Sequence, residues 1–145
     1  MKNKKSKKRI KQSYWIDGFF IFSFTKGQAE RILKRAKKAD IKRRIEEWKL
    51  RVIERDNWTC QRCDNKLEDR KHCHPHHIIA LQAVLRSYQE LLDDINNGVL
   101  TCYSCHKRAP FSAHQGGFEF SYFLMKKKPE QYEFLKSYLE SKNSL

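Results

Sequence analysis

Long apolar runs are missing from this chain of 145 residues, and acidic residues are scarce. No run reaches the length of about eighteen apolar residues that a membrane-spanning helix needs, so we expect no membrane partner. The lysine-rich start also lacks the apolar segment that directs secretion. We therefore expect a cytoplasmic protein whose five cysteines are reduced.

The shortage of acidic residues leaves the chain strongly basic. There are 31 Lys and Arg against 17 Asp and Glu, a net charge of +14. Residues 1–55 hold 19 basic and 6 acidic residues, whereas residues 56–145 hold 12 and 11. A nucleic acid is the natural partner, because each neutralised phosphate releases condensed counterions. The alternative is a solvated basic helix with a disordered tail.

A chain of this length buries only a modest core, so a structural metal would be useful to it. Composition divides the chain into a tail, a basic arm, a cysteine- and histidine-rich core and an aromatic end. We expect a disordered basic tail at 1–12, a mainly helical nucleic-acid-binding arm at 13–56, a metal-bound core at 57–109 and an aromatic-rich extension with a helix at 110–145.

The arm is expected to contain two strands and a helix. Phenylalanines at period two within residues 14–24, around Asp17-Gly18, predict a hairpin of two short strands. Thr25 and Gln28 resemble a capping box, and apolar residues follow at helical spacing, with a break at Asp40 as one reading. The basic residues expected to contact phosphates here are Lys34, Arg35, Lys38, Lys42, Arg43 and Arg51.

Two cysteine pairs predict a zinc site. Cys60 and Cys63 are two residues apart in a spacing that turns both sulfurs toward one ion, and Cys102 and Cys105 repeat it. Four thiolates make a tetrahedral structural Zn²⁺ site. Disulfides would need an oxidising compartment and would leave Cys73 unpaired, so that reading is disfavoured.

The interval between the cysteine pairs contains two adjacent histidines. We expect an edge strand at 70–79 that runs into His76 and His77, and a helix of about three turns at 81–92. Asn97-Gly98 then turns the chain into a returning strand at 99–101, and a helix bearing His106 starts within 103–108. The order is strand, insert, strand and helix.

These motifs together resemble the HNH endonucleases, in the zinc-stapled ββα-metal form of phage and bacteria. The resemblance runs from Trp48 to Lys107 and rests on the two CxxC pairs, His76-His77-Ile78-Ile79, Asn97-Gly98 and Cys105-His106. The fold class it implies is α+β, a ββα-metal (HNH) core with a four-cysteine zinc site. A basic N-terminal helical region and a C-terminal helix flank that core.

The resemblance also assigns roles. It implies that His76 and His106 bind a catalytic divalent metal, that His77 is the general base and that Asn97 is the central Asn of the motif. Neighbouring residues on a strand face opposite ways, so we expect the strand to end at the histidine pair, with Asn97 fixing the bend. Lys107 and Arg108 are phosphate-binding candidates by position.

Other histidines and aromatic residues receive no role in this scheme. We expect His72, Cys73, His74 and His114 to be exposed bystanders. The C-terminal aromatic residues are expected to pack on the N-terminal strand rather than to stack on bases; they are Phe111, Phe118, Phe120, Tyr122 and Phe123. His at position 76 instead of Asp favours transition metals and leaves Mg²⁺, Mn²⁺, Co²⁺ and Ni²⁺ open.

The sequence thus predicts a metal-dependent endonuclease acting on double-stranded DNA. The alternative is a non-catalytic, zinc-dependent nucleic-acid-binding module. Homing, restriction and phage packaging or recombination settings all stay open, as do nicking against double-strand cleavage and a homodimer. We expect a location with the nucleoid or in the cytoplasm of a phage-infected cell.

Overall fold

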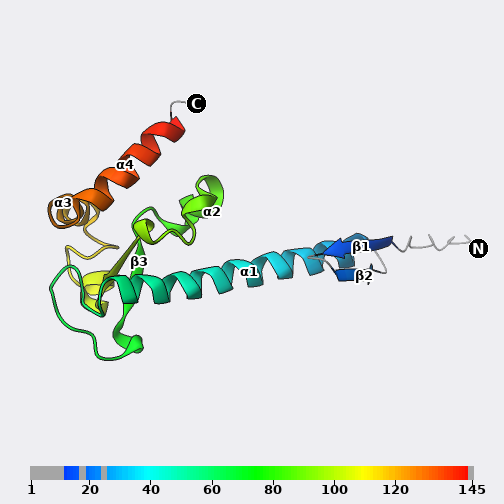
Figure 1. Ribbon diagram of the computed structural model, residues 1–145, viewed down its shortest axis with the longest axis horizontal. Coiled ribbons are helices and arrows are strands. Elements are labelled where there is room, and N and C mark those ends of the chain that lie inside the picture. Colours follow the sequence, from blue (N-terminus) through cyan, green and yellow to red (C-terminus); the bar gives the residue numbers. More distant parts are fainter. Residues whose placement is uncertain (1–11, 17–18, 24–25, 144–145) are drawn as a thin grey trace, which may run out of the picture. The chain divides into compact units, whose positions relative to one another are not determined.

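The computed structural model describes residues 12–16, 19–23 and 26–143 (Figure 1). The expected basic tail lies outside these residues apart from Gln12, and so does Thr25 of the expected capping box. The chain divides into two compact units, 1–43 and 44–145. The predicted four-part division of the chain stays a prediction.

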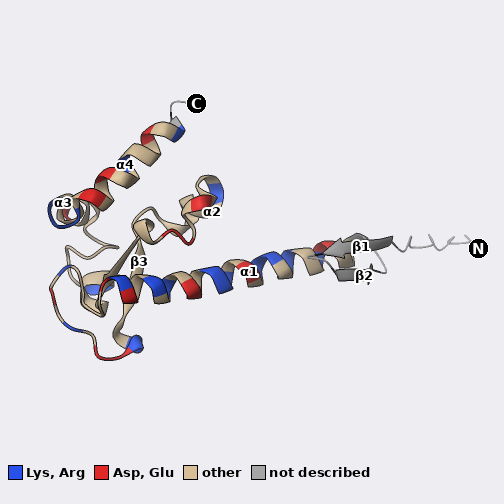
Figure 2. Cartoon of the chain, in the orientation of Figure 1, with Lys and Arg blue, Asp and Glu red and all other residues tan. Residues whose placement is uncertain are grey.

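The first unit contains the hairpin that the sequence predicts. Strands β1 (Gln12–Ile16) and β2 (Phe19–Ser23) pair antiparallel, with Tyr14 opposite Ile21. Helix α1 (Lys26–Arg55) begins in this unit and carries twelve Lys and Arg against five Asp and Glu, which Figure 2 shows as alternating blue and red bands.

Helix α1 is continuous, so the expected break at Asp40 is wrong. A single Asp costs a helix only a few tenths of a kcal/mol, and neither glycine nor proline occurs nearby to interrupt it. The Arg43 guanidinium also donates to Asp40 Oδ1 at 2.6 Å, an i,i+3 pair that supports the helical turn.

The second unit is built on a two-stranded antiparallel sheet. Strand β3 (His74–His77) pairs with β4 (Gly98–Thr101), with His76 opposite Val99 and His77 opposite Gly98. The returning strand is confirmed, but the first strand is shorter than the expected 70–79. Arg70–His72 instead form a 3₁₀ turn (η1), because the Asp69 side chain accepts a hydrogen bond from Lys71 N and caps it.

Helices cover the two faces of this sheet. On one face Trp48, Val52 and Ile53 of α1 pack with Leu100 of β4. On the other face Val99 packs with Phe120 and Leu124 of α3 (Gly117–Lys127), and α4 (Pro129–Asn143) completes the C-terminal end. This mixture of helices with a small antiparallel sheet confirms the predicted α+β class.

The insert between the strands is less helical than expected. Helix α2 spans only Leu81–Ser87, and a 3₁₀ turn at Gln89–Leu91 (η2) follows it. Tyr88 separates the two with φ −133° and ψ 50°, outside the helical region. Leu91 and Leu92 are buried, so the apolar periodicity of this segment reflects core packing on an irregular backbone.

The last turns of α1 hold the segment that leads into β4. The Trp48 ring donates from Nε1 to Asp94 O at 2.9 Å, and the Arg55 guanidinium donates to the carbonyls of Ile95 and Gly98. The buried Asp56 carboxylate accepts from Leu100 N at 2.8 Å and pairs with Arg55. β4, and with it the strand carrying the histidine pair, is thereby fixed against α1.

Gly98 marks the closest approach of the sheet to α1. A Cβ added there would lie 2.5 Å from Val52 Cγ2 and 2.7 Å from Trp48 Cζ2, both in the buried core. We therefore expect Gly98→Ala to lower the free energy of unfolding by about 1–3 kcal/mol, because the core is already filled. Urea unfolding measures this change. Gly117→Ala is the control, because nothing lies within 4 Å of its added Cβ, and an equal loss in both variants would contradict the explanation.

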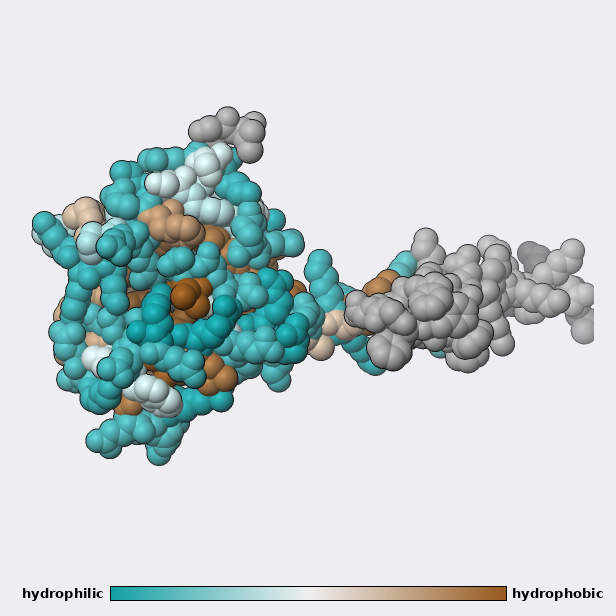
Figure 3. Space-filling model, viewed as in Figure 1, coloured by the Kyte–Doolittle hydropathy of each residue, from teal (hydrophilic) through white to brown (hydrophobic). Residues whose placement is uncertain are grey.

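The part of the chain described by the structure contains no helix long and apolar enough to cross a membrane. In the view of Figure 3 the second unit is mainly hydrophilic at its surface, with hydrophobic side chains in separate small patches.

Candidate metal centre and active site

The four predicted cysteines come together. The Sγ atoms of Cys60, Cys63, Cys102 and Cys105 all lie within 4.8 Å of one another. Cys60 and Cys63 lie on a tight turn. A hydrogen bond from Cys60 N to Asn65 O, 2.9 Å long, closes this turn. Cys102 follows β4, and Cys105 lies on the wide helical turn η4 (Ser104–Arg108).

The geometry of this cluster fits a zinc ion. The Sγ atoms of Cys63 and Cys102 are 3.9 Å apart, close to the ~3.8 Å between two sulfurs that each lie about 2.3 Å from a tetrahedral ion. Burial, and then the charge of a neighbouring Cys60 thiolate, raise the pKa of Cys105. Four adjacent thiolates therefore need a cation to compensate them. The donor set is compatible with structural zinc.

Three histidines form a second cluster. The ring nitrogens of His76, His106 and His114 lie within 4.8 Å of one another, and the Nε2 atoms of His106 and His114 are 3.1 Å apart. Two imidazoles that bind one ion at about 2.1 Å bring their nitrogens to a similar separation. The cluster can therefore accept a metal ion through three imidazoles.

Burial keeps two of these imidazoles neutral. Burial first, and then the neighbouring histidines, lower the pKa of His76 to about 3 and that of His106 to about 4. A neutral imidazole has a free lone pair, which is the form that binds a metal. His106 Nδ1 is also buried, and it has no hydrogen-bond partner among the described residues.

His114 is the residue that sequence reasoning missed. His114 is exposed, as expected, but it lies beside predicted site residues, because the loop 109–116 folds back onto the turn η4. Ala113 N donates to Cys105 O at 3.0 Å, and His114 N donates to His106 O at 3.3 Å. These two hydrogen bonds hold His114 close to Cys105 of the cysteine cluster. The loop that carries His114 is neither helix nor strand, so no periodic sequence pattern would have found this residue.

The two adjacent histidines lie on opposite faces of the sheet. Both belong to β3, and this strand ends at His77, so the expectation that it ends at the histidine pair is confirmed. The His76 ring contacts Phe120 on the α3 face, whereas the His77 ring stacks on Trp48 with ring centroids 3.7 Å apart. The alternation that the sequence predicts is thus retained through the pair.

His77 nevertheless reaches the same cavity as the cluster. A cavity of about 380 Å³ is lined by His76, His77, His106 and His114, together with Pro75, Ile78, Ala80, Leu81 and Ala113. His77 Nε2 lies 3.0 Å from Leu92 O, and since a carbonyl only accepts, Nε2 carries the proton. The lone pair of His77 is therefore on Nδ1. Burial lowers the pKa of this imidazole, which favours its neutral form.

Asn97 is fully buried and holds the chain that follows the histidine pair. Its Oδ1 accepts from Ile79 N at 2.7 Å, and its Nδ2 donates to Ile79 O at 3.3 Å and to Leu91 O at 3.2 Å. Its backbone carbonyl also accepts from Ile78 N. Asn97 thus fixes the exit of β3, where the sequence predicts a bend held by this residue.

The residues predicted to bind phosphate are exposed, but one of them also holds a backbone carbonyl of the core. Lys107 and Arg108 are exposed on the same turn as His106. Arg51 is exposed, but its guanidinium donates to Asp93 O at 2.5 Å and so helps to hold the core. The remaining predicted residues are exposed on the part of α1 in the first unit; they are Lys34, Arg35, Lys38, Lys42 and Arg43.

The other expected bystanders have mixed outcomes. His72 is exposed, as expected. Cys73 is buried in the core beside Trp48 rather than exposed, and it is not part of the cysteine cluster. His74 is half-buried, with its ring 5.6 Å from that of His106 and 5.5 Å from that of Tyr103.

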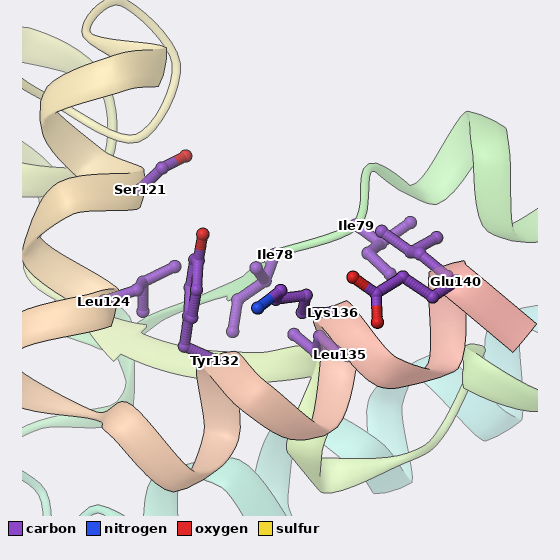
Figure 4. A pocket seen from close by; sticks show the side chains of 9 residues that line it. Ile78, Ile79, Ser121, Leu124, Tyr132, Leu135, Lys136 and Glu140 are labelled. Carbon is purple, nitrogen blue, oxygen red and sulfur yellow. The ribbon is translucent and has the colours of Figure 1, made fainter.

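A second cavity lies between the exit of β3 and helices α3 and α4 (Figure 4). It measures about 340 Å³, and its lining is mainly aliphatic: Ile78, Ile79, Leu124, Leu135 and Leu139. Lys136 and Glu140 contribute its charged groups, and neither an imidazole nor a thiol lines it. Among these two cavities, the clustered histidines line only the first.

Comparison with known proteins assigns the core of the chain to a family. Residues 60–110 match the family model described as HNH endonuclease. The match includes both cysteine pairs, His76, His77, Asn97 and His106, while His114 lies just beyond it. Comparisons with curated proteins and with solved structures gave no match. The resemblance seen in the sequence is confirmed for this segment.

Proposed function

We propose that this protein is a metal-dependent DNA endonuclease that hydrolyses phosphodiester bonds. The observation that carries the proposal is the cavity where His76, His106 and His114, from three separate segments, meet His77. The segment that builds most of this cavity matches the HNH endonucleases. Double-stranded DNA is the proposed partner, and the zinc proposed for the four cysteines has a structural role.

In this proposal His76, His106 and His114 hold a divalent ion. An ion with three protein ligands retains open positions, and it supplies Lewis-acid stabilisation of the charge that develops on the phosphate and on the leaving O3′. Mg²⁺, Mn²⁺, Co²⁺ and Ni²⁺ are the candidates, and the all-imidazole ligand set favours the transition metals.

His77 is the proposed general base. Its Nε2 proton is held by Leu92 O and its ring is held by Trp48, so the tautomer and the ring orientation are both set. Nδ1 is then the atom that takes a proton from the attacking water. Asn97 acts by position, because it fixes the chain on the C-terminal side of His77.

Basic side chains would hold the phosphate backbone. Lys107 and Arg108 are next to His106 in the chain, so they are the proposed contacts close to the cleaved bond. The exposed basic residues of α1 supply affinity that does not depend on sequence. Such contacts to the phosphate backbone do not select a DNA sequence for cleavage.

End-group analysis tests the proposed reaction. A DNA duplex labelled on either strand is incubated with protein and Mn²⁺, and the products are tested for 5′-phosphate and 3′-hydroxyl ends, which the HNH resemblance implies. We expect both ends, and no product when a chelator is present. Products that form equally well without a divalent ion would contradict the proposal.

His114→Ala tests the composition of the metal site. Removing one of three ligands should weaken binding of Mn²⁺ or Ni²⁺ by about ten-fold or more and leave the zinc content at one ion per chain. Isothermal titration of zinc-loaded protein measures this affinity. His72→Ala is the control, because His72 is exposed and outside the cluster. Equal affinities in both variants would exclude His114 as a ligand.

One observation favours the second candidate function, a non-catalytic zinc-dependent nucleic-acid-binding module. The His77 ring is stacked on Trp48, on the face of the sheet opposite to the three clustered histidines. Such a module would contain one zinc per chain and would bind DNA. It would not cleave DNA when Mg²⁺, Mn²⁺, Co²⁺ or Ni²⁺ is added.

A further inference from the structure

Helix α3 exposes aromatic rings that its core packing does not use. Phe118 is 82% exposed and Tyr122 is 52% exposed, and their i,i+4 spacing makes them neighbours on the helix surface. Phe111, 46% exposed, lies on the loop that leads into this helix. We call these three residues, with Arg62 and Lys126, the aromatic surface. Exposed rings gathered in this way mark a binding surface.

Two cations lie over the rings of this surface. The Arg62 guanidinium carbon is 4.9 Å from the centroid of the Phe111 ring and 5.1 Å from that of Phe123. Lys126 Nζ is 5.6 Å from the centroid of the Tyr122 ring. The Arg62 guanidinium also donates to Glu119 O at 3.5 Å, but neither cation takes part in an ion pair within the described part of the chain, so no carboxylate there neutralises either charge.

The aromatic surface is close to the histidine cluster. Phe111 and His114 share the loop 109–116, whose Gly116 lies against the Phe111 backbone. The Phe123 ring beneath Arg62 is 5.5 Å from the Phe120 ring, and Phe120 is 5.4 Å from the ring of His76. A strand that is cleaved at the cluster would therefore reach the Phe111 and Arg62 part of this surface first. Phe118 and Tyr122, on the side of α3 away from the buried Phe120, would contact the strand further along.

We propose that the aromatic surface stacks unpaired bases, so that the preferred substrate is DNA with an unpaired segment beside the cleaved bond. Aromatic faces bind bases and cations bind phosphates, and this combination matches a single strand. Paired bases present only their edges, so a duplex cannot stack on these rings. A second copy of the chain is disfavoured as the occupant, because each copy carries a net charge of +14. The preference for unpaired DNA deepens the proposed nuclease function and rests on it.

The experiment compares three DNAs of one sequence: a full duplex, the duplex with a short unpaired flap, and the flap strand alone. Binding is measured with zinc-loaded protein without added divalent ion, so that no DNA is cut. We expect wild type to bind the flapped DNA about ten-fold more tightly than the duplex, since stacking of one base supplies such a factor. A 2-aminopurine in the flap should change its fluorescence as it stacks.

The double variant Phe118→Leu with Tyr122→Leu keeps apolar bulk and helix propensity but removes two ring faces. It should lose the ten-fold preference and the 2-aminopurine signal, while its affinity for the duplex stays within about two-fold of wild type. Phe134→Leu is the matched control, a 42% exposed Phe on α4 outside the surface, and it should behave as wild type.

The possible outcomes separate the two proposals. Equal binding of duplex and flapped DNA by wild type, or an undiminished preference in the double variant, would overturn the stacking surface. So would a protein that dimerises through these rings, seen as a wild-type dimer that the double variant abolishes. Cleavage of all three DNAs at equal rates after Mn²⁺ is added would overturn the surface and retain the nuclease. A flap preference with no cleavage would retain the surface and reject the nuclease.

Discussion

Replacing His77 with alanine is expected to reduce the rate of DNA cleavage by about 10²- to 10⁴-fold, the contribution of a positioned general base. The partly buried His77 ring is neutral at neutral pH, because burial lowers its pKa. Since Nε2 donates its proton to Leu92 O, the free lone pair is on Nδ1. Single-turnover cleavage of a labelled duplex at saturating Mn²⁺ measures the rate. His72→Ala should cut at the wild-type rate, because its side chain is exposed and outside the cavity.

A second variant separates catalysis from packing, because the His77 ring also stacks on Trp48 in the core. His77→Gln keeps a polar side chain of similar length that can donate to Leu92 O, but an amide does not take up a proton at neutral pH. We expect it to keep its zinc and its affinity for DNA, and to be as inactive as His77→Ala. Wild-type cleavage by His77→Gln would show that His77 is not the base.

Removing the zinc proposed for the four cysteines is expected to unfold the second unit. The small sheet has only two strands, and the turns bearing Cys60, Cys63 and Cys105 meet at the cysteine cluster. Most of the folding free energy of this unit, of order 5–15 kcal/mol for a domain, should therefore depend on the ion. Circular dichroism during titration with a strong chelator, with zinc content measured in parallel, follows the loss.

Cys63→Ser tests the same prediction at one ligand. Cys63 is exposed, so its replacement removes a metal ligand with little change in packing. The matched control is Cys73→Ala, which changes a buried cysteine outside the cluster and should lose stability through packing alone while retaining zinc. The zinc account fails if Cys63→Ser holds zinc as firmly as wild type, or if the chelated protein melts at the unchanged temperature.

Short-range spacing predicted much of the second unit correctly. The separation of the cysteines in each pair places both sulfurs on one turn, and the two turns meet because β3 and β4 pair. The hairpin of β1 and β2 follows from alternation around a turn in the same way. The turn of each cysteine pair and the pairing of β1 with β2 depend on residues close in sequence, which a sequence pattern records directly. The pairing of β3 with β4 instead spans the insert between the two strands.

Features that depend on long-range packing were predicted less well. The apolar spacing of residues 81–92 indicated one helix, but Leu91 and Leu92 are buried from a 3₁₀ turn, because packing requires their side chains and not a regular backbone. His114 joins His106 through backbone hydrogen bonds of an irregular loop, which leave no periodic signal. Burial of Phe120 beside Val99, and exposure of Phe118, follow from how α3 docks on the sheet.

The alternation of the adjacent histidines and the end of their strand at this pair were both predicted correctly from the sequence. Alternation along a strand does turn His76 and His77 to opposite faces, and the structure keeps both in regular register with β4. The strand ends at His77, and both histidines line one cavity. Sequence alone does not reveal the shape of a cavity formed by three separate segments.

Cleavage of supercoiled plasmid tests the central claim most directly. Wild-type protein is treated with a mild chelator that spares the four-cysteine zinc, and Mg²⁺, Mn²⁺, Co²⁺ or Ni²⁺ is then added back. The account predicts nicked or linear DNA only after an ion is returned, with zinc still at one per chain. Intact plasmid under every ion, from protein that retains its zinc and binds DNA, would contradict the nuclease and leave a non-catalytic zinc module.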